Sequence, residues 1–401
     1  MLPEGWKRCA LGEIAQVTSG GTPDRSEPAY WGGTIPWVTT GEIQFNTITD
    51  TTEKITEAGL KNSSAKLFPP GTLLMAMYGQ GKTRGQVAKL AIEAATNQAC
   101  AAILMNEGAD PEFFFQFLAS HYEAIRELGN AGTQKNLSGS LIKEISVPVP
   151  PEGEQKRIAH ILATWDESIM ASAKLLANSR KQKLRLAQHW FGEMNSRWEQ
   201  RRLSEVASRV QRQSDGGDHP VLMISSGSGF VRQDQKYSRF MAGKSLDDYV
   251  LLKRGEFAYN KGNSKLYEFG CVFPLEGHSQ GLVPHVYVCF SLSNECDPSF
   301  FKHLFEADYL RDQLGALVNT GVRNNGLLNI RPADFMNVRV PVPPADVQKR
   351  IANVLAAASE VIALREREVA VLKEEKRALM QQLLTGKRRV RRPAIATKAA
   401  A

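Results

Sequence analysis

The stretch AMYGQGKT, residues 76–83, contains residue types that could bind a phosphate group or a nucleic acid. A phosphate loop needs glycine amides around the phosphates, a lysine that reaches them and a hydroxyl group for Mg²⁺. Lys82 and Thr83 meet the last two needs, but a further glycine opposes a helix start, and no apolar strand ending in Asp follows. The alternative is a loop that presents Gln80, Lys82, Thr83 and Arg84 to DNA, because Gln and Arg bond to base edges and Lys holds phosphate. A solvated turn is the third interpretation.

Three further loops carry amide and cationic side chains between glycines. GTQKNL (residues 132–137) and TGVRNNGLL (residues 320–328) occupy corresponding places in the two halves of the chain, and YNKGNSK (residues 259–265) corresponds to the first loop. Such side chains suit base edges and phosphates, but they suit ordinary turns equally well. The candidate DNA contacts in these loops are Gln134, Lys135, Asn136, Asn260, Lys261, Asn263, Lys265, Arg323, Asn324 and Asn325.

The sequence shows no pattern typical of catalysis or of a metal site. The 7 histidines form no HxxxH or HExxH motif, and the 5 cysteines have no CxxC spacing. There is no NPPY-type methyltransferase motif, no glycine-rich adenosylmethionine loop after a strand and no helicase motif. We therefore expect a non-catalytic binding protein.

Charge and hydrophobicity restrict the class of protein further. The 401 residues have a net charge of +8, but residues 1–152 hold 12 Lys and Arg against 16 Asp and Glu, whereas residues 346–401 hold 13 against 6. The basic excess lies outside the first globular region, so composition alone does not establish DNA binding. No apolar run approaches the roughly 20 residues that span a bilayer. The N-terminus has no signal-peptide core, so we expect a cytoplasmic protein without a membrane partner.

One segment occurs twice in the chain. VPVPPEGEQKRIAHILA (residues 147–163) and VPVPPADVQKRIANVLA (residues 340–356) are identical at 12 of 17 positions. WKRCALGEIA from Trp6 is repeated as WEQRRLSEVA from Trp198. The repeat therefore predicts that each half of the chain forms a globular unit, then a proline hinge with a fixed extended backbone, and then a helix.

Each hinge precedes a helical pattern with apolar positions spaced alternately by four and three residues, as a coiled-coil seam requires. At 1.5 Å per residue, each helix would be roughly 60 Å long and must pack on the other helix or on a partner. Polar seam positions such as Lys183 and Lys376 predict register-setting contacts, partner contacts or solvated stretches. The predicted seams are Ile158, Leu162, Trp165, Ile169, Ser172, Leu176, Ser179, Lys183, Leu186 and Trp190, and Ile351, Leu355, Ala358, Ile362, Arg365, Val369, Leu372, Lys376, Leu379 and Leu383.

Local patterns predict mixed α and β structure in the globular units. TIPWVTT (residues 34–40), GTLLMAMYG (residues 71–79) and EFAYNKG (residues 256–262) are typical of strands that end in turns. Residues 110–128 and 297–314 are typical of amphipathic helices that begin with Asp and Pro.

With these features, the chain resembles the specificity subunits of type I restriction-modification enzymes. The resemblance lies in TSGGTPDRSEPAYWGGTIPWVTTGEI (residues 18–43), TNQAC (residues 96–100) and the repeated hinge and helix. It implies an α+β fold with two tandem α/β-type target-recognition domains, separated by two long antiparallel coiled-coil helices in a pseudo-twofold repeat. The implied domains are recognition domains at 1–152 and 195–345 and spacer helices at 153–194 and 346–386. The basic composition of residues 387–401, without apolar periodicity, predicts a disordered tail.

The same resemblance implies the function. Each recognition domain would read one half of a split, asymmetric site in double-stranded DNA, while the helices set the unread spacer and dock two methyltransferase subunits. Restriction subunits with endonuclease and translocase activity are further implied partners. S-adenosylmethionine, ATP and Mg²⁺ would be cofactors of these partners and not of this chain. Two alternatives are left open by the residues: a nucleotide-binding protein that uses residues 76–83, and a coiled-coil scaffold for other proteins.

Overall fold

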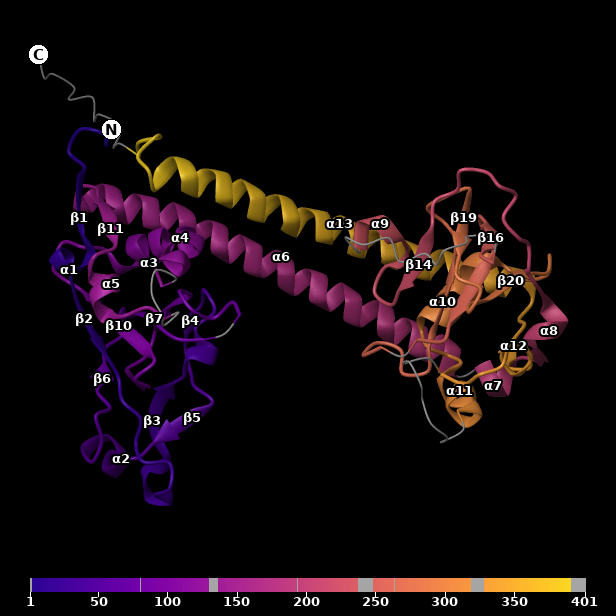
Figure 1. Ribbon diagram of the computed structural model, residues 1–401, viewed down its shortest axis with the longest axis horizontal. Helices are drawn as coiled ribbons and strands as arrows, with labels where there is room; N and C mark the ends of the chain where they lie inside the picture. Colours follow the sequence, from indigo (N-terminus) through magenta and orange to yellow (C-terminus); the bar gives the residue numbers. More distant parts are fainter. Residues whose placement is uncertain are drawn as a thin grey trace, which may run out of the picture. The chain divides into compact units, whose positions relative to one another are not determined.

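The computed structural model describes residues 2–79, 81–129, 136–192, 194–236, 248–262, 264–318 and 328–390. The chain divides into two compact units, the first formed by Met1–Ala173 with Glu368–Ala401 and the second by Lys174–Arg367. The two long helices, α6 (Glu152–Gly192) and α13 (Ala345–Leu383), each contribute to both units (Figure 1).

The first unit contains two sheets and a small pair of strands. In the larger sheet the order is β2-β10-β7-β8-β4, and in the smaller it is β5-β3-β9-β6, while β1 pairs with β11. The strands are β1 (Lys7–Ala10), β2 (Ala15–Ser19), β3 (Trp31–Val38), β4 (Thr47–Ile48), β5 (Glu53–Ile55), β6 (Leu67–Phe68), β7 (Leu73–Ala76), β8 (Val87–Leu90), β9 (Ala94–Thr96), β10 (Cys100–Met105) and β11 (Ser146–Val149). The short helices are α1 (Leu11–Ile14), η1 (Pro28–Tyr30), η2 (Thr40–Glu42), α2 (Glu57–Lys61), α3 (Pro111–Ser120), α4 (Tyr122–Leu128) and α5 (Gly139–Lys143).

The second unit repeats the central part of this plan. Its main sheet has the order β13-β20-β17-β18, which matches β2-β10-β7-β8, and β12 pairs with β21 as β1 does with β11. The strands are β12 (Gln200–Arg202), β13 (Ala207–Arg209), β14 (Leu222–Ser225), β15 (Gly229–Arg232), β16 (Val250–Lys253), β17 (Phe257–Asn260), β18 (Cys271–Pro274), β19 (Gln280–Val283), β20 (Val288–Leu292) and β21 (Arg339–Pro341). The short helices are α7 (Met194–Arg197), α8 (Leu203–Val206), α9 (Gln233–Lys236), α10 (Pro298–Glu306), α11 (Arg311–Leu317) and α12 (Pro332–Met336).

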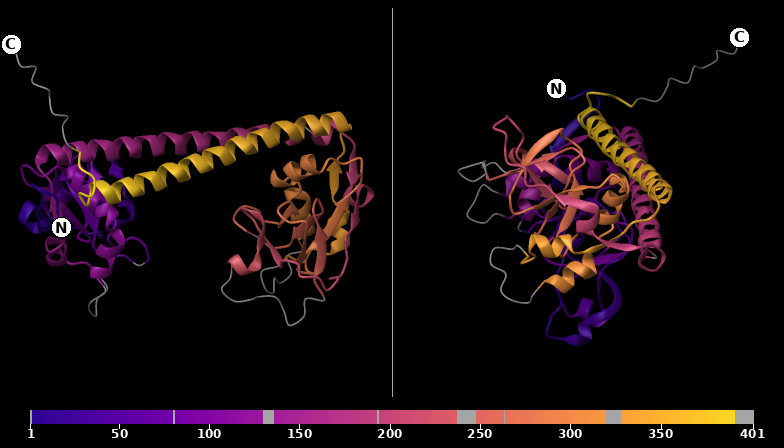
Figure 2. Two further views of the ribbon diagram at one scale, coloured as in Figure 1. Left: turned by 90° about the horizontal axis from the view of Figure 1, so that it is seen from above. Right: turned by 90° about the vertical axis from the view of Figure 1, so that its right-hand side faces the viewer.

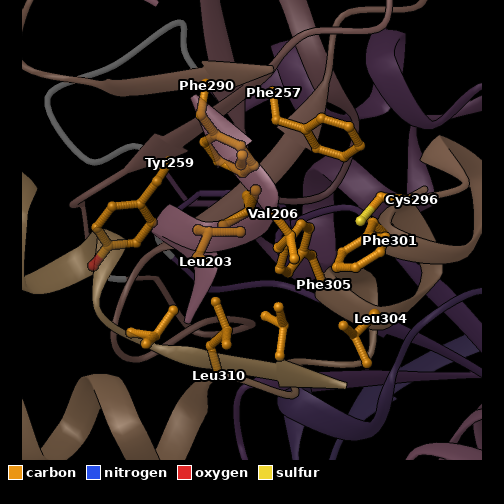
Figure 3. Close-up of a cluster of buried hydrophobic side chains, with 14 of the residues drawn as sticks. Leu203, Val206, Phe257, Tyr259, Phe290, Cys296, Phe301, Leu304, Phe305 and Leu310 are labelled. Atoms are coloured by element: carbon orange, nitrogen blue, oxygen red, sulfur yellow. The ribbon is translucent and has the colours of Figure 1, made fainter. Parts of the chain in front are cut away.

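Each unit is held together by aromatic and aliphatic side chains of its repeated elements. In the second unit, Phe257 and Phe290 stack with their ring centroids 5.5 Å apart, and Phe305 of α10 packs edge-on against both (Figure 3). Leu203 of α8 and Leu304 of α10 lie in the same cluster and are fully buried. The burial of such side chains contributes about 1.5–3 kcal/mol each, so the core fixes the sheet from which the loops emerge.

The predicted helix starts are confirmed, but both predicted helices are interrupted. Asp110 accepts a hydrogen bond from the amide of Phe113 at 2.9 Å, and Asp297 accepts one from the amide of Phe300 at 2.9 Å. The first helix then ends at Ser120 and α4 begins at Tyr122. In the second unit, α10 ends at Glu306, before Asp308, which has a φ of 57°, outside the right-handed helical region.

The proline hinges are short strands that continue into the long helices. Val147 pairs with Cys9, and Val340 pairs with Arg201, in the two-stranded sheets. Each hinge is therefore a short edge strand with a proline exit, which is compatible with the predicted stiff, extended backbone.

The long helices pair antiparallel within each unit. In the first unit, Asp166 bonds to Lys376 and Ser172 to Glu368, so residue numbers rise along α6 as they fall along α13. In the second unit, Arg180 of α6 bonds to Glu366 of α13 at 2.6 Å. Figure 2 shows the N-terminus beside the C-terminal end of α13 in the first unit, where Arg389 donates a hydrogen bond to the carbonyl of Glu4 at 2.9 Å.

The predicted seam matches the burial of the helices except at one position. Every predicted seam residue of α13 is buried or half-buried, and so is every predicted one of α6 apart from Leu186. Leu186 is 37% exposed, whereas its neighbour Ala187 is 6% exposed. An α-helix has 3.6 residues per turn and drifts against a strict 3.5-residue repeat, which explains the shift by one residue. The predicted α+β fold class, with two globular regions and two long helices packed together, is confirmed.

Candidate nucleic-acid interface

The first predicted loop joins β7 to β8 in the first unit. The two strands are antiparallel neighbours, and the amide of Gly85 donates to the carbonyl of Ala76 at 2.8 Å. Tyr122 and Arg126 of α4 donate hydrogen bonds to the carbonyls of Lys82 and Gly81. Packing on α4 therefore holds this hairpin loop in place.

This geometry rules out the phosphate-loop interpretation of residues 76–83. A phosphate loop places the phosphates at the N-terminus of a helix that follows directly. Here the loop is followed by strand β8, which begins at Val87. Amides of a helix N-terminus are therefore not available to phosphates at this place.

The candidate residues of this loop differ in exposure. Lys82 is exposed and Thr83 is half-buried, whereas Arg84 is only 6% exposed. The position of Gln80 lies outside the described residues. Of the described candidates, Lys82 is best placed to meet a ligand from solvent.

The second predicted loop of the first unit docks beside the hairpin loop. The amide of Leu137 donates to the carbonyl of Met77 at 3.0 Å, and Asn136 is half-buried. The candidates Gln134 and Lys135 lie outside the described residues. The structure thus brings together two segments that are far apart in the sequence.

The second unit repeats this arrangement. The loop between β17 and β18 begins at Asn260, whose side chain accepts a hydrogen bond from the amide of Gly262 at 3.0 Å. The amide of Leu328 donates to the carbonyl of Lys261 at 3.2 Å, in the way that Leu137 bonds to Met77 in the first unit.

The cationic candidates of the second unit lie in different surroundings. Lys265 is exposed, whereas burial and, secondly, the charge of Arg209 lower the pKa of Lys261. Asn263, Arg323, Asn324 and Asn325 were also predicted as contacts, and they lie outside the described residues.

A polar cavity of the second unit was not predicted from the sequence. Its volume is about 450 Å³, and it is lined by Arg209, Gln211, Gln213, His285 and Tyr287, among others. The sequence signal is an alternation of long polar side chains in RVQRQ, residues 209–213, which has no counterpart in the first copy.

The repeated glutamine of the hinge segments is a structural clamp. Gln155 is 1% exposed; its side chain accepts from the amide of Asp110 at 2.8 Å and donates to the carbonyls of Gly108 at 3.2 Å and Pro150 at 2.8 Å. It therefore ties the long helix α6, the hinge and the start of α3 together.

The second copy has the same clamp. Gln348 is also 1% exposed; it accepts from the amide of Asp297 at 2.8 Å and donates to the carbonyls of Glu295 at 3.1 Å and Pro343 at 2.8 Å. We call these two residues the glutamine clamps. They explain in physical terms why QKRIA occurs twice.

Two seam lysines join each globular region to the helix that comes from the other copy. Lys376 of α13 bonds to Asp166 of α6 at 2.7 Å and to Gln116 of α3 at 3.0 Å. At the corresponding place in the second unit, Lys183 of α6 bonds to Glu306 of α10 at 3.1 Å. Of the alternatives left open for these lysines, the structure supports register-setting contacts.

The histidine beside the second seam lysine belongs to the same network. His303 lies 2.9 Å from Glu306. Burial acts to raise the pKa of Glu306, but the bond from His303 and the charge of Lys183 outweigh it and lower this pKa to about 2. Glu306 is therefore ionised at neutral pH and neutralised by its partners.

Within the part of the chain that the structure describes, there is no group of three or more His, Cys, Asp and Glu side chains that could hold a metal ion. In the same residues, none of the helices combines the length and the apolar character that crossing a membrane requires.

Comparison with known proteins gives one consistent class. Residues 3–178 match the family described as the type I restriction modification DNA specificity domain. The MjaIX specificity subunit of a type I restriction enzyme from Methanocaldococcus jannaschii is 25% identical, over 97% of this chain and 95% of that protein. The EcoKI specificity subunit from Escherichia coli K12 is 22% identical, over 90% of this chain and 84% of that protein.

A solved structure has the same fold. The crystal structure of a type I restriction-modification S subunit from M. genitalium matches with a TM-score of 0.57 and 15% identity, over 96% of both chains. The sequence and fold comparisons agree with the repeat of globular unit, hinge and helix. The sequence comparisons identify the chain as a DNA-specificity subunit of a type I restriction-modification system, a subunit that is itself non-catalytic.

Proposed function

We propose that each globular unit reads one half of a split DNA site through its paired loops, and that α6 and α13 fix the spacing between the halves. One observation carries this proposal: the same two loops are docked together at the same place in both units, by Leu137 on Met77 and by Leu328 on Lys261. The side chains on these loops differ between the copies, as two unlike half-sites require.

The residues proposed as DNA contacts are those predicted from the sequence. Lys82 and Lys265 are exposed cations on equivalent hairpin loops, suited to phosphates. Asn136 and Asn260 lie at the bases of the loops, where amides can bond to base edges.

We further propose that the recognition domains are 1–152 and 195–345, with helices at 153–194 and 346–386. Of the proposed tail at 387–401, the described part includes Arg389, whose guanidinium bonds to Glu154 at 2.8 Å, so this part is anchored on the first unit.

The proposed protein partners are two methyltransferase subunits, joined by restriction subunits in the complete enzyme. A further solved chain with a TM-score of 0.57 and 17% identity comes from work on complex assembly and conformational transition of the type I R-M system. S-adenosylmethionine, ATP and Mg²⁺ are proposed cofactors of these partners.

Grooves at equivalent places in the two units support docking of two copies of one partner. In the first unit a groove of about 700 Å³ lies beside α4, α6 and α13, with Tyr122 and Met380 in its wall. In the second unit a smaller groove of about 190 Å³ lies beside α10, α6 and α13, with Leu184 and Leu355 in its wall. Leu184 is 52% exposed, so apolar surface is available to a partner.

Exchange of one recognition domain tests the proposal that each domain reads one half-site. Residues 1–152 would be replaced by the corresponding segment of another specificity subunit, and the methylated motif would be read by methylome sequencing. We expect one half-site to change while the other half-site and the spacer stay the same. A change in both half-sites would refute the proposal.

Lengthening the helices tests the spacing role. Seven residues, one seam repeat, would be inserted after both Leu176 and Val369, which keeps the apolar spacing. The added length of about 10.5 Å corresponds to about three base pairs of DNA. We expect a longer spacer with unchanged half-site letters, and altered letters would contradict this role.

A further inference from the structure

The cavity of the second unit lies beside an extended segment that continues β13. Arg209 pairs with Phe290 of β20, the amide of Val210 donates to the carbonyl of Cys289 at 2.9 Å, and Gln213 forms a bridge with Val250. Successive side chains of an extended backbone point to opposite faces. Residues 209, 211 and 213 are expected to share one face, and all three line the cavity together with Arg212.

The segment is fixed by the residues between these positions. Val210 is 8% exposed. The guanidinium of Arg212 donates to both carboxylate oxygens of Glu256, at 3.2 and 3.1 Å, and to the carbonyl of Leu251 at 2.9 Å. Arg212 is thus engaged within the protein, and it holds the segment in place while Gln211 and Gln213 are exposed on either side of it.

The lining of the cavity carries charges of both signs, because Arg209 and Arg212 are cationic and Asp248 is acidic. The Nε atom of Arg209 is buried and has no hydrogen-bond partner among the residues that the structure describes. Lys261, from the loop predicted to contact DNA, lies within the electrostatic influence of Arg209. The buried Nε–H group of Arg209 therefore favours a partner that offers a hydrogen-bond acceptor.

The first unit lacks this surface at the corresponding place. The repeat offset of 192, from Trp6 to Trp198, places Ser19 opposite Gln211 and Gly21 opposite Gln213. Gly21 is buried, and a Cβ atom there would clash with the backbone and Oγ of Ser64. The first unit therefore covers the position that the second unit leaves open.

We propose that Gln211 and Gln213 read base edges in the major groove of the half-site bound by the second unit, with Arg209 as a third contact. This inference rests on the proposed function and names specificity-determining residues for it. Residues two apart on an extended strand are about 6.8 Å apart, which equals about two base-pair steps of 3.4 Å. Gln pairs bidentately with adenine and Arg with guanine, so adenines two steps apart are the expected targets of the glutamines.

Single alanine substitutions test the inference in the complete complex with its methyltransferase subunits. Gln211→Ala and Gln213→Ala would each be compared with wild type by methylome sequencing and by methylation rates on duplexes that vary one base pair. Each variant is expected to lose about tenfold to a hundredfold in discrimination at one position of one half-site. The other half-site and the spacer are expected to stay unchanged.

The matched control is Ser208→Ala, an exposed residue of the same segment on the opposite face, which is expected to keep the motif. An unchanged motif in both glutamine variants would overturn the inference. Equal loss on all sequences with a shallower salt dependence would also overturn it, because that result indicates phosphate contacts. If the wild-type complex itself methylates no split motif, the proposed function fails, and the two failures are therefore distinguishable.

Discussion

The hydrogen bonds of the glutamine clamps allow us to predict how much the loss of one clamp destabilises the region that it holds. Gln348→Ala removes three hydrogen bonds of a buried side chain, one from the amide of Asp297 and two to the carbonyls of Glu295 and Pro343. Each bond contributes about 1 kcal/mol net, so the loss should be about 3 kcal/mol. This corresponds to a rise of roughly 100-fold in the opening equilibrium of the region that the clamp holds.

The opening of this region can be measured by peptide-level hydrogen exchange and mass spectrometry. The amides at the start of α10, around Phe300, should exchange roughly 100-fold faster in Gln348→Ala than in wild type, because the clamp secures the residue that caps this helix. The equivalent amides of α3, around Phe113, should exchange at the wild-type rate.

The matched variant is Gln155→Ala, which removes the same three kinds of bond from the first unit. It should reverse the pattern, with faster exchange in α3 and unchanged exchange in α10. If both variants loosened the same unit, or if neither altered exchange, the clamps would not have the role that the structure gives them.

Three further perturbations have defined outcomes. Lys376→Met removes the ammonium group that joins α13 to α3 and α6, and loss of these charged bonds should cost about 2 kcal/mol; unchanged urea unfolding would contradict this. Burial raises the pKa of Asp308 to about 6 from 3.8, so its ionisation destabilises the folded state increasingly as pH rises between these values. Asp308→Asn should stabilise the protein by about 1 kcal/mol at pH 8, after allowance for its partial exposure, and by nothing near pH 3; a stabilisation independent of pH would refute this origin. Arg389→Gln leaves the buried carboxylate of Glu154 without its cation, and the wild-type pair stabilises the fold only while Glu154 is ionised, above its lowered pKa. Tm should therefore fall at pH 7 and fall less near pH 3; an equal fall at both pH values would argue against the ion pair.

The parts of the fold that could be predicted are those that follow from local patterns in the sequence. The spacing of apolar residues identified both long helices, and Asp-Pro pairs identified the starts of α3 and α10. Repetition of the hinge segment by itself indicated two equivalent units. The interruption near Asp308 was missed because no glycine or proline in the sequence marks its positive φ.

The contacts that position the candidate site were harder to predict. Gln155 bonds to residues 45 and 47 positions away, and no periodicity reports such partners. The exposed face of residues 209–213 was missed because a short strand with alternating polar residues is also typical of an ordinary edge strand. Lys82 and Lys265 remain predicted contacts: Lys82 was proposed from the glycine-rich stretch 76–83, and Lys265 from the loop that corresponds to it in the second copy.

Methylome sequencing of cells with and without the gene is the decisive measurement for the proposed function. We expect an asymmetric motif of two half-sites with a fixed unread spacer, methylated only when the gene is present. A contiguous motif, or a split motif that persists after deletion of the gene, would contradict it.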